Sequence, residues 1–214
     1  MFKYQINYIK INFMKTIKDM AFGEVEILGS TFISFLYPSN SKDEVNNILS
    51  KLRKEHPKAR HICYACNVKD YVHSSDDGEP SSTAGKPLLQ ILTMNNLINV
   101  SLFVVRYFGG TKLGAGRLLR TYVEAGTLAV NKAIRYDIVN GYIYKCETGY
   151  ETYNHILSYA NKNKYDILNI NFEETIKFDI VTSIDIEKNL KELFPNLKYE
   201  KLNKEILLKE NENE

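Results

Sequence analysis

The sequence has no apolar run of the length that a membrane-spanning helix requires. Its most apolar stretch, residues 98–105, has the length of a strand and is far shorter than the roughly 18 residues of a spanning segment. The N-terminus also lacks an apolar segment followed by a small-residue cleavage site, as a secretory signal peptide would have. We therefore expect a cytoplasmic protein that does not enter a membrane.

Cysteine is scarce, since the chain has only Cys63, Cys66 and Cys146. An odd number of widely spaced cysteines excludes a disulfide framework and favours reduced thiols. His61 next to the first two cysteines resembles a zinc site, but no second Cys-x-x-Cys exists, and a strand would turn Cys63 and Cys66 to opposite faces. We expect small buried thiols, with no metal and no cofactor.

Familiar enzyme motifs are also missing. No Gly-x-Ser-x-Gly occurs, so a serine hydrolase of that type has no support. The pair Gly85-Lys86 is followed by Pro87 and not by the Ser or Thr of a phosphate-binding loop. Gly114 and Gly116 lack the third glycine of a dinucleotide-binding motif. Both nucleotide-binding folds are therefore excluded.

Arginine is absent from the last third of the chain. Residues 1–140 carry 12 Lys and 6 Arg against 12 acids, a net charge of +6, whereas residues 141–214 carry 10 Lys against 14 acids, a net charge of −4. Arginine recognises phosphate and carboxylate with a planar fork of donors. The first part is therefore the predicted anion-binding part, although a chance partition of a lysine-rich composition would look the same.

The periodicity predicts a first domain over residues 21–138, preceded by an extension of unknown role over residues 1–20. Ser41 and Glu44 have the spacing of a capping box, and Ser82 or Thr83 is expected to cap the next helix. The apolar residues 98–105 predict a central strand covered on both faces. The expected elements are strands 24–28, 31–37, 59–68, 71–74 and 98–105, helices 41–55 and about 114–135, and a helix after residue 83 with Pro87 in its first turn.

A boundary is expected at residues 137–141, followed by a second domain over residues 141–207 and a solvated tail over 208–214. The predicted elements are strand 142–148, helix 150–162, strands 165–171 and 175–181, helix 184–194 and strand 197–207. This β-α-β-β-α-β order is that of the ferredoxin-like split unit. The fold class is therefore α+β with two domains.

Two runs of unusual composition follow each other in the first part. Residues 75–87 are acidic, and residues 106–120 place glycines among basic residues. Glycine-rich loops are costly to order, so they usually shape the backbone for a ligand or for a tight packing corner. The amides and the positive dipole end of the helix that starts near Gly114 would hold an anion such as phosphate. The alternative is a strand-to-helix corner whose arginines pair with the acids.

Asp76, Asp77 and Glu79 allow two interpretations. Such carboxylates can bind Mg²⁺ or act as an acid and base pair, as in a metal-assisted enzyme on a phosphate- or carboxylate-bearing small molecule. They are also common turn-forming residues.

Five segments together resemble the signature of the Impact/YigZ family. They occur in the family's order, and the resemblance covers roughly residues 20–135. Ser82 and Arg117 depart from the pattern, since the family usually has glycine at both positions. The segments are His61-Ile62-Cys63-Tyr64-Ala65, Ser75-Asp76-Asp77-Gly78-Glu79-Pro80, Thr83-Ala84-Gly85-Lys86-Pro87, Arg106-Tyr107-Phe108-Gly109-Gly110 and Lys112-Leu113-Gly114-Ala115-Gly116 with Arg120.

The resemblance implies a first domain similar to domain IV of elongation factor G, in the ribosomal-protein S5 domain-2-like fold. It implies a second domain similar to that factor's ferredoxin-like domain V. Family members are linked to translational control, and bacterial ones are suspected of binding nucleic acid. Eukaryotic members compete for a partner of a stress-responsive kinase, which we do not transfer to this chain.

We therefore expect a protein without chemistry of its own that binds RNA or a ribosomal surface in the regulation of translation. The rival functions are the metal-assisted enzyme and a protein-interaction module that uses the second domain. The turn glycines are expected to let the backbone approach the ligand closely. The acids are expected to organise the arginines by charge pairing. The predicted phosphate-binding residues are Arg106, Lys112, Arg117 and Arg120, supported by Lys86; the turn glycines are Gly109, Gly110 and Gly114; the loop-organising acids are Asp76, Asp77 and Glu79.

Overall fold

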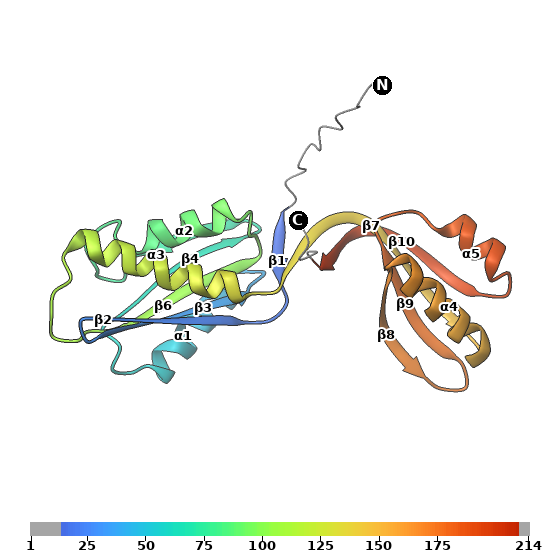
Figure 1. Cartoon of the computed structure of the whole chain (residues 1–214), viewed down its shortest axis with the longest axis horizontal. Helices are drawn as coiled ribbons and strands as arrows, with labels where there is room; N and C mark the ends of the chain where they lie inside the picture. The colour runs from blue at the N-terminus through green and yellow to red at the C-terminus, as the bar shows by residue number, and fades with distance from the viewer. Residues whose placement is uncertain (1–13, 210–214) are drawn as a thin grey trace, which may run out of the picture. The chain divides into compact units, whose positions relative to one another are not determined.

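The computed structural model describes residues 14–209, and residues 1–13 and 210–214 lie outside the described part. Most of the expected N-terminal extension and of the expected tail therefore falls outside it. The chain divides into two compact units (Figure 1). Within the described residues, unit 1 runs as far as Asp137 and unit 2 comprises Ile138–Leu208.

Unit 1 consists of one antiparallel sheet with helices on both faces. The strand order is β2-β3-β6-β4-β5, so β6 is the central strand. The elements in chain order are β1 (Lys15–Ile17), β2 (Ala21–Ile27), β3 (Ser30–Pro38), α1 (Lys42–Glu55), β4 (His61–Val68), β5 (Tyr71–Ser75), α2 (Gly85–Met94), β6 (Val100–Tyr107) and α3 (Ala115–Lys132).

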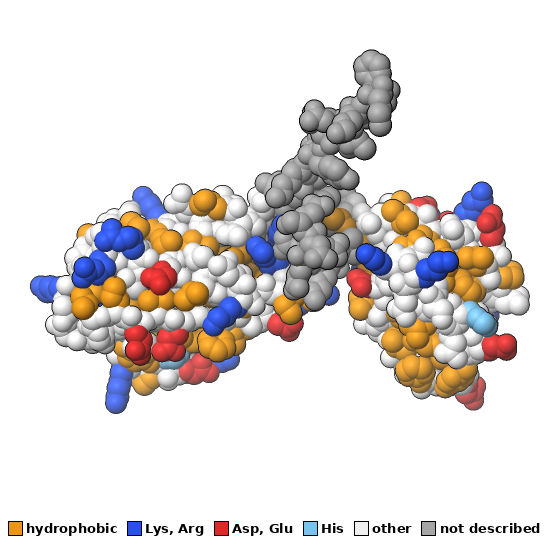
Figure 2. All heavy atoms as spheres, viewed as in Figure 1, with side chains coloured by type: hydrophobic (Ala, Val, Ile, Leu, Met, Phe, Trp, Pro, Cys, Tyr) orange, Lys and Arg blue, Asp and Glu red, His pale blue; other side chains and the backbone are white. Residues whose placement is uncertain are grey.

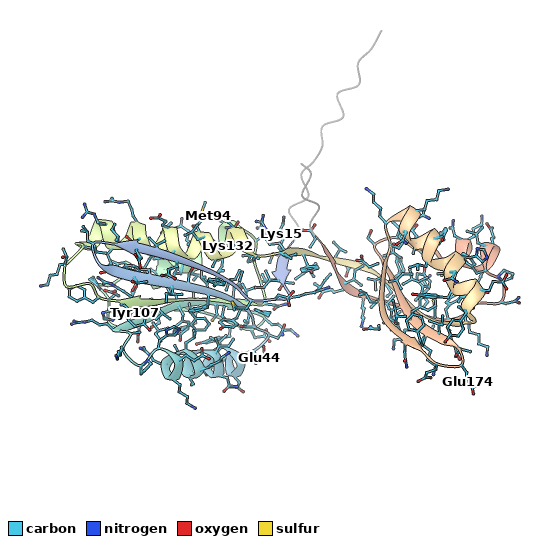
Figure 3. The ribbon with its side chains drawn as sticks, turned by 60° about the horizontal axis from the view of Figure 1, so that its bottom comes forward. Lys15, Glu44, Met94, Tyr107, Lys132 and Glu174 are labelled. Atoms are coloured by element: carbon cyan, nitrogen blue, oxygen red, sulfur yellow. The ribbon has the colours of Figure 1, made fainter. Side chains whose placement is uncertain are left out.

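The two faces of this sheet form two separate cores. Helices α2 and α3 lie side by side on one face, where Tyr122 and Leu88 pack against β3 and β6. Helix α1 covers the other face with Val45 and Leu52. Figure 3 labels Met94 and Lys132 near the adjacent C-terminal ends of α2 and α3. Strand β6 is buried from Val100 to Arg106, as expected for a strand covered on both sides.

The Ser41 half of the capping box that the sequence predicts at α1 is present. The Ser41 hydroxyl accepts from the Glu44 amide at 3.2 Å, which satisfies one of the amides that a helix start leaves unpaired. The Glu44 carboxylate accepts from the amide of Asn40 at 2.7 Å, one residue before the Ser41 N-cap, and so holds the chain that leads into α1.

Strand β1 lies within the expected N-terminal extension over residues 1–20. It pairs antiparallel with the start of β7 (Arg135–Thr148), and Ile17 is 2% exposed within the same core as α2 and α3. The lysine before it, Lys15, also forms an ion pair with Asp137 at 3.8 Å. Residues 15–17 are therefore part of the unit 1 fold.

The second antiparallel sheet has the strand order β1-β7-β9-β8, with β10 also paired to β7, so its strands within unit 2 follow the order β10-β7-β9-β8. Its core holds Tyr144, Phe178 and Ile156, with Leu190 from the second helix. The order of elements is the predicted one, but β7 starts at Arg135, so the boundary between the units lies inside a strand and not in a loop. The elements are β7, α4 (Tyr150–Asn163), β8 (Asp166–Phe172), β9 (Ile176–Thr182), α5 (Glu187–Leu193) and β10 (Lys198–Lys209).

Among the helices of residues 14–209, none combines the length and the apolar character needed to cross a membrane.

The burial of Ile17 leads to a test of β1. We expect Ile17→Ala to lower the free energy of unfolding by about 2–4 kcal/mol, because the side chain leaves a cavity in the core. Denaturant unfolding of the full chain measures the change. The control is Met20→Ala, whose side chain is 45% exposed and should matter little. An unchanged stability of the Ile17 variant would show that β1 does not contribute to the core.

Candidate functional site

The acidic loop and the glycine-rich turn meet in unit 1, although residues 85–107 separate them in the sequence. The acidic loop connects β5 to α2, and the glycine-rich turn connects β6 to α3. Between them lies a cleft of about 430 Å³. The acidic loop and the start of β4 contribute Arg60, His61, Glu79 and Pro80. The end of β6, the turn and the first turn of α3 contribute Arg106, Phe108, Lys112, Leu113, Gly114 and Leu118.

A buried ion pair between Glu79 and Arg106 joins these segments. Glu79 is 9% exposed and Arg106 6% exposed, and Arg106 Nη1 donates to Glu79 Oε1. The hydroxyl of Tyr122, on α3, donates to the same oxygen at 2.8 Å. A buried ion pair is tolerable only when further hydrogen bonds compensate the loss of water. Tyr122 provides one, so the pair connects the acidic loop, β6 and α3.

His61 stands at the edge of this pair. Its Nδ1 lies 2.7 Å from the backbone carbonyl oxygen of Asp77, and a carbonyl oxygen only accepts, so Nδ1 carries a proton. Its Nε2 lies 3.9 Å from Glu79 Oε2. In the neutral ring Nε2 is therefore an acceptor, and it belongs to the lining of the cleft.

Asp76 caps helix α2 from outside the helix. Its carboxylate accepts from the amides of Ser82 at 2.9 Å, Ala84 at 2.9 Å and Gly85 at 2.8 Å. Burial alone would raise the pKa of Asp76, but these three amides and the charge of Lys86 outweigh it and hold the pKa below its usual value. The predicted cap by Ser82 or Thr83 is wrong, because the Ala84 cap position makes no side-chain bond to the helix.

Asp77 anchors the other side of the acidic loop to β4 and α1. Its carboxylate accepts from the amide of Ile62 at 2.6 Å and from the guanidinium of Arg53 on α1. The residue has a φ of 45°, in the left-handed region that Asp tolerates better than most side chains. Ser82, with a φ of 62°, also adopts this left-handed conformation, which glycine adopts without steric cost.

The three acids therefore do not converge. Asp76 faces backbone amides, Asp77 faces Arg53 and Ile62, and Glu79 faces Arg106. Within residues 14–209, no three His, Cys, Asp or Glu side chains are grouped as a metal site would require. Of the predicted charge pairing with the arginines of the strand-to-helix corner, the structure contains Glu79 with Arg106, whereas Asp77 pairs with Arg53 on α1.

The predicted phosphate-binding residues fall into two groups. Lys86, Lys112, Arg117 and Arg120 are exposed, and Figure 2 shows Lys and Arg side chains on the end of unit 1 where α3 begins. Arg106, in contrast, is buried and held by Glu79. Thr121, the residue after Arg120, is 2% exposed and donates to the carbonyl of Arg117 at 2.9 Å. Arg106 thus differs from the other four in its access to a ligand.

The turn glycines also have different roles. A Cβ on Gly109 would lie 1.9 Å from the Gly29 carbonyl carbon, so this glycine allows the turn to pack against the β2–β3 hairpin. Gly110 and Gly114 have φ values of 86° and 73°, with open space where a Cβ would point. They are required by backbone conformation and leave the surface in front of α3 accessible.

Sequence reasoning missed four residues of the site. Arg60 and Phe108 line the cleft, with the Arg60 guanidinium carbon 5.7 Å from the Phe108 ring centre. The other two are Tyr122, which donates to Glu79, and His61, whose position near two cysteines suggested only a zinc site. The available signal for Arg60 and His61 was their position at the start of β4, which lies opposite Arg106 and so beside the site.

The cysteines behave as structural thiols. Cys63 and Cys66 are fully buried, and Cys63 donates to the Asp76 carbonyl at 3.0 Å. Burial raises the pKa of both thiols, and it raises that of Cys146 to about 12. These thiols therefore stay protonated near neutral pH, which is unfavourable for nucleophiles or metal ligands.

Comparison with known proteins gives consistent matches. The model of the Impact N-terminal domain matches residues 28–130. An IMPACT family member from Haemophilus influenzae is 35% identical over 159 residues, which cover 72% of this chain and 77% of that protein. Alignments to the family members YvyE of Bacillus subtilis and YigZ of Escherichia coli are 38% and 37% identical but cover only 55% and 54% of those proteins.

Two solved structures are also similar. The crystal structure of a hypothetical protein is 24% identical, has a TM-score of 0.57 and covers 88% of this chain and 97% of that one, which supports the α+β two-domain fold. The structure of Yih1, described as a two-domain translational regulator, is 25% identical over 56% of this chain and 47% of its own. Its TM-score of 0.33 is too low to support an argument about this chain.

The cap by Asp76 predicts a pH-dependent effect on stability. Near neutral pH, we expect Asp76→Asn to lower the free energy of unfolding by about 2 kcal/mol, because a neutral amide accepts fewer and weaker bonds from the three amides. The folded state lowers the pKa of Asp76, so its contribution is complete above the ordinary carboxyl pKa and disappears as pH falls through the lower folded-state value. The difference between the variant and wild type should therefore shrink below about pH 4.

Denaturant unfolding at several pH values measures this difference. Asp70→Asn is the control, since Asp70 is an exposed acid in the β4–β5 turn. A difference that stays constant from neutral to acidic pH would contradict a role for the Asp76 charge.

The ion pair predicts strong coupling between its partners. We expect Glu79→Gln to cost about 3 kcal/mol of unfolding free energy, because it leaves the Arg106 charge buried without compensation. The double variant Glu79→Leu/Arg106→Met should lose less unfolding free energy than the sum of the losses in Glu79→Leu and Arg106→Met alone. Denaturant unfolding of all the variants completes the cycle, with exposed Glu124→Gln as the control. Strict additivity would show that the two side chains do not depend on each other.

Proposed function

Because the chain belongs to the IMPACT family, we propose that it is a non-enzymatic protein of translation control that binds RNA or a ribosomal surface. The binding residues are assigned to the basic surface formed by Lys86, Arg117 and Arg120, with Lys112 at its border with the cleft. We place its action in the cytoplasm, where translation occurs, and expect a protein partner of the translation machinery in addition to the RNA.

The observation that supports this proposal most strongly is the start of α3. Gly114 occupies its N-cap without a side-chain bond, the first turn contains no acid, and the helix is 18 residues long. Amides at such a terminus, together with the helix dipole, attract anions. Arg117 and Arg120 are exposed on the first two turns. Exposed cations next to a helix start are the arrangement by which proteins contact phosphate without reading base sequence.

In this proposal Arg106 has a positioning role. It is buried against Glu79, and its backbone carbonyl accepts from the amide of Arg60 at 3.0 Å. Its ion pair keeps the acidic loop next to the glycine-rich turn, which in turn precedes Lys112 and α3. The phosphate contacts are left to the exposed cations.

We further propose that unit 1 has the ribosomal-protein S5 domain-2-like fold of elongation factor G domain IV, over about residues 21–138. Unit 2, over about residues 141–207, would then correspond to the ferredoxin-like domain V. The β-α-β-β-α-β order of unit 2 and its strand order β10-β7-β9-β8 support this assignment.

The rival functions have weaker support. A metal-assisted enzyme needs Asp76, Asp77 and Glu79 to share a ligand, and each of them faces a different partner. A protein-interaction module that uses unit 2 would leave the basic surface of unit 1 without a role. It predicts RNA affinity that does not depend on Arg117 and Arg120.

Fluorescence anisotropy with a labelled RNA hairpin carrying a single-stranded tail tests the proposal. We expect the full chain to bind with an affinity that falls steeply with salt. Arg117→Glu/Arg120→Glu should abolish binding at moderate salt, because two phosphate contacts become repulsive. The milder Arg117→Gln/Arg120→Gln should reduce the salt slope by up to about 2, since each lost phosphate contact removes about one from it.

The control changes the same amount of charge in unit 2. Lys145→Glu/Lys198→Glu replaces two exposed lysines there and should leave most of the RNA affinity intact. Circular dichroism verifies that all variants are folded. Equal losses in the two charge-reversal variants would show a nonspecific charge effect, and no binding by wild type at low salt would refute the RNA contact.

A further inference from the structure

The cleft between the acidic loop and the glycine-rich turn has properties that the basic surface does not explain. At about 430 Å³ it falls in the size range of small-molecule sites. All its lining residues belong to unit 1. We propose that this cleft binds a nucleoside monophosphate group, with its phosphate at the start of α3 and its base against Phe108.

One side of the cleft is suited to a phosphate. Lys112, Gly114 and Ala115 line it where α3 begins, and the α3 terminus has no side-chain cap. Arg60 and His61 lie on the facing side, at the start of β4. A dianionic phosphate would therefore meet two exposed cations, Lys112 and Arg60, and the positive end of the α3 dipole.

Arg106 provides an independent indication of a ligand in the cleft. It lines the cleft and is 6% exposed, and its Nε is buried without a hydrogen-bond partner among the described residues. Leaving a guanidinium donor buried and unpaired is costly, and such groups are rare in folded proteins. The Glu79 carboxylate compensates the Arg106 charge through Nη1, so Nε is the donor of this cleft-lining side chain that lacks a partner.

The other side of the cleft is apolar and includes an exposed aromatic ring. Phe108 is 39% exposed, and Pro80, Leu113 and Leu118 line the cleft with it. The guanidinium carbons of Arg60 and Arg106 lie 5.7 Å and 5.6 Å from the Phe108 ring centre. Exposed aromatic rings next to arginines are the surfaces on which nucleic-acid bases stack.

These two sides fit the two halves of a nucleotide better than they fit a simple anion. Inorganic phosphate would use only the cations and the helix start and would leave Phe108 in water. A nucleoside monophosphate group occurs both in a free nucleotide and at the phosphorylated end of an RNA chain. The test distinguishes these two sources.

Isothermal titration calorimetry on the full chain at low salt tests the cleft. The probes are AMP, GMP, CMP and UMP, with inorganic phosphate and adenosine as the two halves. We expect at least one nucleotide to bind more tightly than either half. Phe108→Ala should weaken nucleotide binding about tenfold, since the free energy of stacking one base on an aromatic ring corresponds to about that change in affinity. It should leave the binding of inorganic phosphate unchanged, whereas Lys112→Ala should weaken both.

Matched controls use residues outside the cleft. Phe22→Ala removes another exposed phenyl ring, 53% exposed and paired with Lys132 across 5.3 Å, and Lys69→Ala removes another exposed lysine. Both should bind nucleotide as wild type does. If Lys112→Ala proves unstable, Arg60→Ala replaces it. Competition by short RNAs with and without a terminal phosphate identifies the source: competition by the phosphorylated RNA alone indicates a chain end, and no competition indicates a free nucleotide.

The proposal is overturned if no nucleotide binds at millimolar concentration. It is also overturned if inorganic phosphate binds as tightly as every nucleotide, or if Phe108→Ala has no effect. The inference does not depend on the proposed RNA contact, which is tested with Arg117 and Arg120. Loss of nucleotide binding in the cleft variants with retained RNA binding would support the cleft, and RNA binding without any nucleotide binding would refute the cleft alone.

Discussion

The ion pair between Glu79 and Arg106 is the interaction on which the arrangement of unit 1's functional end depends. It is buried, and it joins the acidic loop to the end of the central strand, with Tyr122 adding α3 to the same carboxylate. A buried charge is stable only with its partner in place, so the three segments can adopt only one mutual arrangement without a large cost. The cleft and the exposed start of α3 follow from that arrangement.

The two helices on this face of the sheet differ in how their N-termini are satisfied. Asp76 supplies α2 with a negative charge that bonds its first amides, whereas α3 starts at a glycine without a side-chain cap. The positive end of α2 is thereby neutralised within the protein, and that of α3 remains available to a ligand. We therefore assign both binding functions to the start of α3. RNA contact is assigned to its exposed arginines, and a nucleotide is assigned to the cleft beside it.

Much of the fold was predictable because it follows from local patterns. The apolar residues of β6 predicted a central strand, and the Ser41–Glu44 spacing predicted the start of α1. What local patterns did not predict are contacts between separate elements of the fold. Ile17 is buried because β7 pairs with β1 from more than a hundred residues away, and the α2 cap comes from Asp76 in the preceding loop and not from Ser82 or Thr83. Neither contact leaves a periodic signal in the sequence.

The sequence by itself determined the order of elements, the concentration of arginine in the first part and the glycines that permit positive φ at positions 110 and 114. These depend on residue type and on neighbours along the chain. Only the tertiary structure decided which charges remain available to a partner. Arg106, Arg117 and Arg120 have the same chemistry and close positions, but the sheet buries the first against Glu79 and α3 exposes the other two. The physical reason is that burial and pairing depend on long-range packing, which brings together residues that no local pattern relates.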